Sequence, residues 1–221
     1  MQRQSLLYII VCILWATLTT CLNKSDIEPR FNNKSVPANF IMDVPLYKAG
    51  KRIGKEKVIN RYINRDALEL GLDSLRWGYD SLQIRVWLGH SLGAKHVIIL
   101  KYENNTWKGQ VINFGKVFDD SGNIVTAKIA EHKSPKSGWN SFTKRLFALD
   151  ILTLPHEDDV IGYESCGLDG NPFHFEWATT KKYRLYSYCN PDGNVKKFWQ
   201  ARNVLKIAEL LETEFDFEYT N

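Results

Sequence analysis

The chain has 221 residues, a formal net charge of +4 and 44% hydrophobic residues. This length favours a single ordinary domain, and the composition excludes wholesale disorder. Nucleic-acid binding requires a concentrated basic face, which so small a net charge does not supply. We therefore expect a globular protein that does not bind nucleic acid.

The first twenty residues differ in composition from the rest of the chain. A positive start at Arg3 precedes an apolar run over residues 6–18. At helical rise this run covers about 20 Å, less than the roughly 30 Å hydrocarbon core of a bilayer. It therefore predicts a secretory signal peptide over residues 1–20. Residues 21–45 are polar and contain prolines, which predicts a flexible tether.

The sequence Leu18-Thr19-Thr20-Cys21 resembles the lipobox of bacterial lipoproteins, in which an apolar residue and two small residues precede a lipidated cysteine. The resemblance implies lipid on Cys21 and a membrane anchor at the start of the mature chain. Thr20 departs from the Gly, Ala or Ser that usually stands before the cysteine. An ordinary cleaved signal and an uncleaved anchor are the alternatives.

Residues 46–221 are predicted to form one α+β domain. Alternating or β-branched apolar residues predict strands at 82–88, 94–102, 106–114 and 123–131, joined by short turns as an antiparallel meander. Residues 172–180 and 182–189 predict a C-terminal hairpin. Helical spacing predicts two to three helices, within 53–70, 139–149 and 194–215. Grouped strands with helices at the ends, and no regular βαβ alternation, indicate the α+β class.

The sequence GHSLG at residues 89–93 has the spacing of a hydrolase nucleophile elbow, with Ser91 as the candidate nucleophile. Candidate partners are His174 and an acid from Asp150, Asp158 or Asp159. An elbow needs a helix directly after the serine, but the residues that follow are apolar and β-branched, as in a strand. We therefore interpret the motif as a hairpin turn and expect no catalytic residues. A serine hydrolase using Ser91, His174 and Asp150 is the alternative.

His174 and Glu176 lie two residues apart on a predicted strand and therefore share one face. Phe173 and Phe175 lie on the other face, so one face is expected to be buried and the other polar. We interpret His174 and Glu176 as a solvent-facing pair. The sequence predicts no metal site and no cofactor.

Cys166 and Cys189 remain after the signal peptide and the lipidated cysteine. An exported protein lies where disulfides persist, so these two residues are candidates for a disulfide. If Cys166 lies on a strand beyond the first strand of the hairpin, the two Cα atoms are about 9–10 Å apart, too far for a disulfide. If Cys166 lies in the loop before the hairpin, the bond can form. Both arrangements stay open.

Residues 138–155 (GWNSFTKRLFALDILTLP) and 168–191 (LDGNPFHFEWATTKKYRLYSYCNP) resemble a pattern of uncharacterised lipoproteins from Bacteroidetes-type bacteria. That resemblance implies an envelope lipoprotein and brings no activity or catalytic residues with it. We therefore predict a non-enzymatic lipoprotein of the bacterial cell envelope, at the outer rather than the inner membrane, that binds a protein or glycan partner. Besides a serine hydrolase, an immunity or inhibitor lipoprotein is an alternative.

Overall fold

The computed structural model describes residues 39–44, 59–89, 95–165 and 172–218. These residues belong to one compact unit, Lys34–Asn221. The predicted signal peptide, Cys21, Ser91 and Cys166 lie outside the described residues. Within the described ranges, no helix combines the length and the apolar character needed to cross a membrane.

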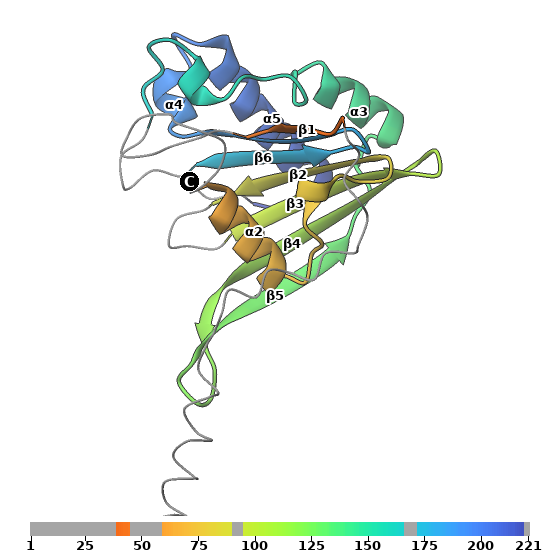
Figure 1. The fold of residues 1–221 in the computed structure, drawn as a ribbon, viewed down its shortest axis with the longest axis vertical. Helices are drawn as coiled ribbons and strands as arrows, with labels where there is room; N and C mark the ends of the chain where they lie inside the picture. The colour runs from red at the N-terminus through yellow and green to blue at the C-terminus, as the bar shows by residue number, and fades with distance from the viewer. Residues whose placement is uncertain (1–38, 45–58, 90–94, 166–171, 219–221) are drawn as a thin grey trace, which may run out of the picture. The chain divides into compact units, whose positions relative to one another are not determined.

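A seven-stranded sheet forms the centre of the unit (Figure 1). Its strands are β1 (Ile41–Asp43), β2 (Leu82–Leu88), β3 (Lys95–Glu103), β4 (Thr106–Phe118), β5 (Ile124–His132), β6 (Phe173–Ala178) and β7 (Lys182–Tyr188). They lie in the order β1-β7-β6-β2-β3-β4-β5, and only β1 and β7 pair in parallel. Strands β2–β5 form the predicted meander and β6–β7 the predicted hairpin, so the α+β fold class is confirmed.

Helices cover both faces of the sheet. They are α2 (Ile59–Glu69), α3 (Trp139–Phe147), α4 (Pro191–Asn194) and α5 (Trp199–Phe215), with the short 3₁₀ turns η2 (Leu75–Trp77) and η3 (Glu157–Asp159). Phe142 of α3 and Leu211 of α5 share a core cluster with Val86 of β2. Ile63 of α2 shares a second cluster with Trp87 of the same strand. Because consecutive strand residues point to opposite sides, these clusters define an α5 face and an α2 face of the sheet.

The local sequence explains two features of the meander, a two-residue turn with positive φ and a close backbone contact at Gly109. Asn104 and Asn105 form the turn between β3 and β4 with φ of 49° and 61°, and asparagine tolerates this left-handed conformation in two-residue hairpin turns. Gly109 of β4 lies where the sheet meets α5. A Cβ atom there would lie 2.5 Å from the carbonyl oxygen of Lys133 and 2.9 Å from the ring of Phe215, so only glycine fits.

The start of the described chain differs from the sequence-based expectation. Residues 41–43, assigned to the tether by their composition, form the edge strand β1 and pair with Lys182–Arg184 of β7. The side chain of Val44, directly after this strand, is buried. Phe40 and Met42 also pack against the core cluster of the α2 face. Backbone pairing to β7 and packing of these apolar side chains therefore order the segment.

The α2 face of the hairpin is not exposed to solvent. His174 and Glu176 are 5% and 1% exposed, so the prediction of a solvent-facing pair was wrong. Alternation along β6 correctly separates these two residues from Phe173 and Phe175. However, α2 and η2 cover the second face as well, and the strand is therefore buried on both sides.

Candidate functional site

The predicted hydrolase residues are not brought together. Asp150 follows α3, and its Oδ2 lies 3.4 Å from Nδ2 of Asn203 on α5, which places it on the α5 side of the sheet. His174 lies on the α2 face of β6, opposite Ser187 of β7. The sheet therefore separates Asp150 from His174, and Ser91 lies outside the described residues.

A different serine, histidine and aspartate meet at the end of β7. Ser187 Oγ lies 3.0 Å from His156 Nε2, and His156 Nδ1 lies 3.0 Å from Asp158 Oδ2. These are the contacts of a Ser–His–Asp triad. Sequence reasoning named Asp158 as a candidate acid but missed the other two residues, because no sequence motif links them.

The hydrogen bonds of this set do not suit catalysis. His156 Nδ1 lies 3.0 Å from Asp158 Oδ2 and also 3.1 Å from the backbone N–H of Asp158, which donates to it. In the tautomer that accepts this backbone bond, the ring proton is on Nε2 and points at Ser187 Oγ. A general base needs the opposite arrangement, with Nε2 accepting the serine proton. With Ser187 only 1% exposed, these contacts fasten η3 to β7.

Glu157 joins the loop after η3 to the end of β7. Its carboxylate accepts hydrogen bonds from Ser165 Oγ at 3.2 Å and from the backbone N–H of Cys189. Burial raises the pKa of Glu157 to about 7. Cys189 is disulfide-bonded, and its partner lies outside the described residues because they contain no other cysteine.

Side chains of β7 also hold the segment that leads into η3, by binding its carbonyl groups. The pairs are Tyr186 Oη to Ile151 O at 2.5 Å, Tyr188 Oη to Pro155 O at 2.6 Å and Arg184 Nη1 to Leu152 O at 2.9 Å. Polar groups at this end of the sheet therefore satisfy backbone acceptors of residues 151–155. We assign them a structural role.

The α2 face contains a buried ion pair. Arg85 Nη1 lies 3.6 Å from Glu176 Oε2, and both residues are 1% exposed. Glu176 also accepts hydrogen bonds from Trp87 Nε1 at 3.3 Å and Tyr183 Oη at 3.2 Å, while Arg85 Nη2 donates to the carbonyl of Asp73 at 2.6 Å. Desolvation raises the pKa of Glu176. A substrate cannot reach this pair, and across the described ranges no group of His, Cys, Asp or Glu is placed to hold a metal ion.

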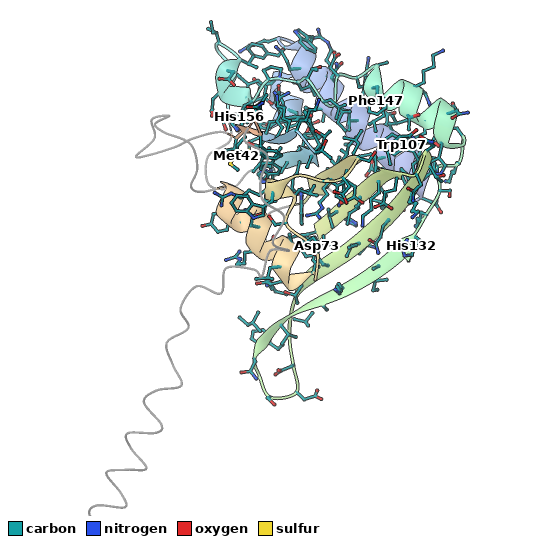
Figure 2. All side chains as sticks on the ribbon, turned by 45° about the vertical axis from the view of Figure 1, so that its right-hand side comes forward. Met42, Asp73, Trp107, His132, Phe147 and His156 are labelled. Atoms are coloured by element: carbon teal, nitrogen blue, oxygen red, sulfur yellow. The ribbon has the colours of Figure 1, made fainter. Side chains whose placement is uncertain are left out.

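Exposed apolar side chains gather on the β4–β5 hairpin instead. Phe118, Ile124 and Ile129 are 75%, 66% and 65% exposed, and Val117 and Val125 are also exposed. Figure 1 shows the hairpin extending past α2, and Figure 2 shows its side chains standing away from the rest of the unit. His132 at the end of β5 and Met42 of β1 mark the two edges of the sheet in Figure 2. We call the outer side of β5, with Val117 and Phe118, the β5 edge.

Hydrogen bonds beyond both ends of the β4–β5 ladder show which β5 groups face outward. The N–H of Asp119 donates to Asn123 O at 2.9 Å, and the N–H of Lys133 donates to Gly109 O at 3.0 Å. Bonded and non-bonded pairs alternate along an antiparallel ladder of constant register. Odd-numbered residues of β5 therefore face β4, and even-numbered residues direct their N–H and C=O groups to the free edge. The outward-facing residues are Ile124, Thr126, Lys128, Ala130 and His132.

Charged side chains near the β5 edge contact partners within the same chain and do not project over the open backbone of β5. Edge strands are often protected by a lysine that projects over the open backbone. Here Lys128 Nζ donates to the carbonyl of Leu70, just after α2. Glu131 pairs with Lys133 at 3.1 Å. The open backbone of β5 is therefore flanked by apolar side chains rather than by projecting charges.

Comparison of the chain with protein-family models and with curated proteins gives no match. The geometry of the β5 edge makes it the candidate site.

Proposed function

We propose that this protein is a non-enzymatic, membrane-tethered lipoprotein of the bacterial cell envelope, anchored through lipid on Cys21, that binds an extended polypeptide strand along the β5 edge. One observation carries the proposal. A nine-residue edge strand directs alternate backbone groups outward, and no described strand pairs with its outer side. Exposed apolar side chains flank it on both faces.

Strand addition suits this surface because an added strand would bond the open backbone groups of β5 and also pack against its exposed apolar side chains. Each outward-facing residue offers one donor and one acceptor, and every backbone hydrogen bond formed to an added strand contributes about 0.5–1.5 kcal/mol. The same strand would pack beside Ile124 on the α2 face and beside Ile129 and Val125 on the α5 face. A lipid anchor would hold the site at the membrane and raise the local concentration of a membrane-bound partner.

Hydrogen exchange tests the proposal with a control inside the same strand. Backbone amides of Ile124, Thr126, Lys128 and Ala130 should exchange rapidly in the dilute purified full chain, because they face solvent. In membranes of the host they should exchange more slowly by about tenfold or more, since each 1.4 kcal/mol of protection is a factor of ten. The amides of Val125, Ala127 and Ile129 bond to β4 and should be protected in both samples.

Proline and serine substitutions at Ala130 provide a matched pair of variants. Ala130→Pro removes one outward-facing N–H and leaves the ladder to β4 intact, a position where edge strands accept proline. Ala130→Ser keeps the N–H at the same exposed position. We expect loss of membrane-dependent protection with proline and retention with serine. Equal exchange of the outward amides in both samples of the unaltered chain would refute strand binding.

The anchor has its own test. The intact mass of the protein purified from host membranes should correspond to a chain that begins at Cys21 and carries diacylglycerol. A soluble, lipid-free chain cut at another position would remove the tether from the proposal and leave the β5 edge unaffected.

A further inference from the structure

We propose that the strand added at the β5 edge is β5 of a second copy of this chain, antiparallel and centred on Ala127. This inference rests on the proposed function and names its partner. A two-fold axis perpendicular to the sheet would join the two units into one continuous sheet. Because such an axis keeps the α5 face and the α2 face of both copies on the same sides, residues of like character meet across the junction.

The pairing centred on Ala127 places apolar residues opposite apolar residues. On the α5 face, Val125 meets Ile129 of the second copy and Ala127 meets its own counterpart. On the α2 face, Ile124 meets Ala130 of the second copy. Outward-facing residues oppose outward-facing residues throughout, so their N–H and C=O groups can bond. Opposed apolar pairs of this kind stabilise a sheet.

Neighbouring registers are less favourable. A one-residue slip would oppose an outward-facing residue to one whose backbone groups bond to β4. A centre at Lys128 would put two lysines directly opposite each other, and like charges at that position are destabilising. A centre at Thr126 would oppose Ile129 to Asn123 and Ile124 to Lys128. The register centred on Ala127 avoids both mismatches.

The placement of the charged side chains supports a second copy as the occupant. Lys128 would meet Thr126 of the second copy, and its Nζ already contacts the carbonyl of Leu70 in its own chain. Glu131 lies beside Lys133 of its own chain and would meet the uncharged Asn123. No charged residue of β5 therefore opposes one of the same sign. One self-complementary strand can cover the exposed Ile124 and Ile129 of both copies.

Disulfide trapping tests the register. Ala127 and its counterpart would form a non-bonded pair about 4.5 Å apart at Cα, within the range that a disulfide spans. We expect full-length Ala127→Cys protein in host membranes to form a cross-linked dimer under mild oxidation. Ala130→Cys is the control, because two Ala130 residues would lie about 20 Å apart at strand rise. Copies carrying Ala130→Cys should cross-link only when mixed with copies carrying Ile124→Cys, and the parent chain gives the background of its native cysteines.

The outcomes separate this inference from the proposed function. Cross-linking of Ala127→Cys that is abolished by adding Ala130→Pro supports the second copy. No dimer with Ala127→Cys, together with membrane-dependent protection of the outward amides, would mean that another polypeptide supplies the strand. The inference would then fail and the proposed function would stand. Neither cross-linking nor protection would refute both, and equal cross-linking of Ala127→Cys and Ala130→Cys would refute the register.

Discussion

Replacing Glu176 by glutamine should lower the free energy of unfolding much more than the small change in side-chain shape suggests. Trp87 Nε1 and Tyr183 Oη donate to different oxygens of Glu176, and glutamine keeps only one of the two. The substitution also removes the charge that lies 3.6 Å from Arg85 Nη1. Removing one partner of a buried ion pair costs about 3–5 kcal/mol, because the other charge stays buried without compensation. At about 2–4 °C per kcal/mol for a unit of this size, Tm should fall by about 6–20 °C.

Urea unfolding followed by tryptophan fluorescence measures the free energy of unfolding of each variant. Glu209→Gln on the exposed side of α5 is the matched control, and it should change the free energy by less than about 0.5 kcal/mol. The double variant Arg85→Met with Glu176→Leu should recover most of the loss, because apolar replacements of a buried pair are often neutral or stabilising. A loss below about 1 kcal/mol for Glu176→Gln would refute the assignment of an ionised pair in the core.

Three further predictions concern other parts of the structure. Burial raises the pKa of Glu157 from 4.5 to about 7, so the folded state favours the protonated form and the free energy of unfolding should fall as the pH rises from 4.5 to 7. Glu157→Gln should lack this fall and should be more stable than the parent in urea at pH 8. Parallel pH profiles of the two proteins would contradict this prediction. Gly109→Ala should cost about 1–3 kcal/mol by thermal unfolding, because its Cβ would meet the carbonyl of Lys133; an unchanged Tm would show that the contact relaxes freely. We expect Cys166 to be joined to Cys189, because Glu157 binds both Cys189 and the residue before Cys166. The intact mass measured without reductant should then be two hydrogens lower than the mass of the reduced chain. Peptide mapping that pairs Cys189 with another cysteine would overturn this assignment.

The strands were predictable because alternation of apolar residues and β-branched content are local features of the sequence. Residues 82–88 were predicted as a strand and form β2 with those bounds. Sequence reasoning did not predict that β6 pairs with β2, because strand order depends on contacts between distant segments. Sequence reasoning also did not predict that helices cover both faces of the sheet at β6, for the same reason. Nothing near His174 or Glu176 in the sequence shows that α2 will lie over them.

The candidate site was accessible from the sequence only in part. The strand at β5 and its turn were predicted, but its position at the sheet edge was not. Exposure of Ile124 and Ile129 depends on that position, since the same residues in an inner strand would be core. Contacts such as that of Ser187 with His156 join segments without a shared motif. They could be found only after the fold had placed β7 beside η3.

The strand order has a consequence for how the chain acquires its structure. β2 is flanked by β3, which follows it directly, and by β6, which begins at Phe173. A nascent chain can assemble the meander early, but the other side of β2 stays uncovered until the last quarter of the polypeptide has been synthesised. Such distant pairing slows folding and leaves an intermediate prone to aggregation. The topology therefore favours folding after synthesis of the whole chain is complete.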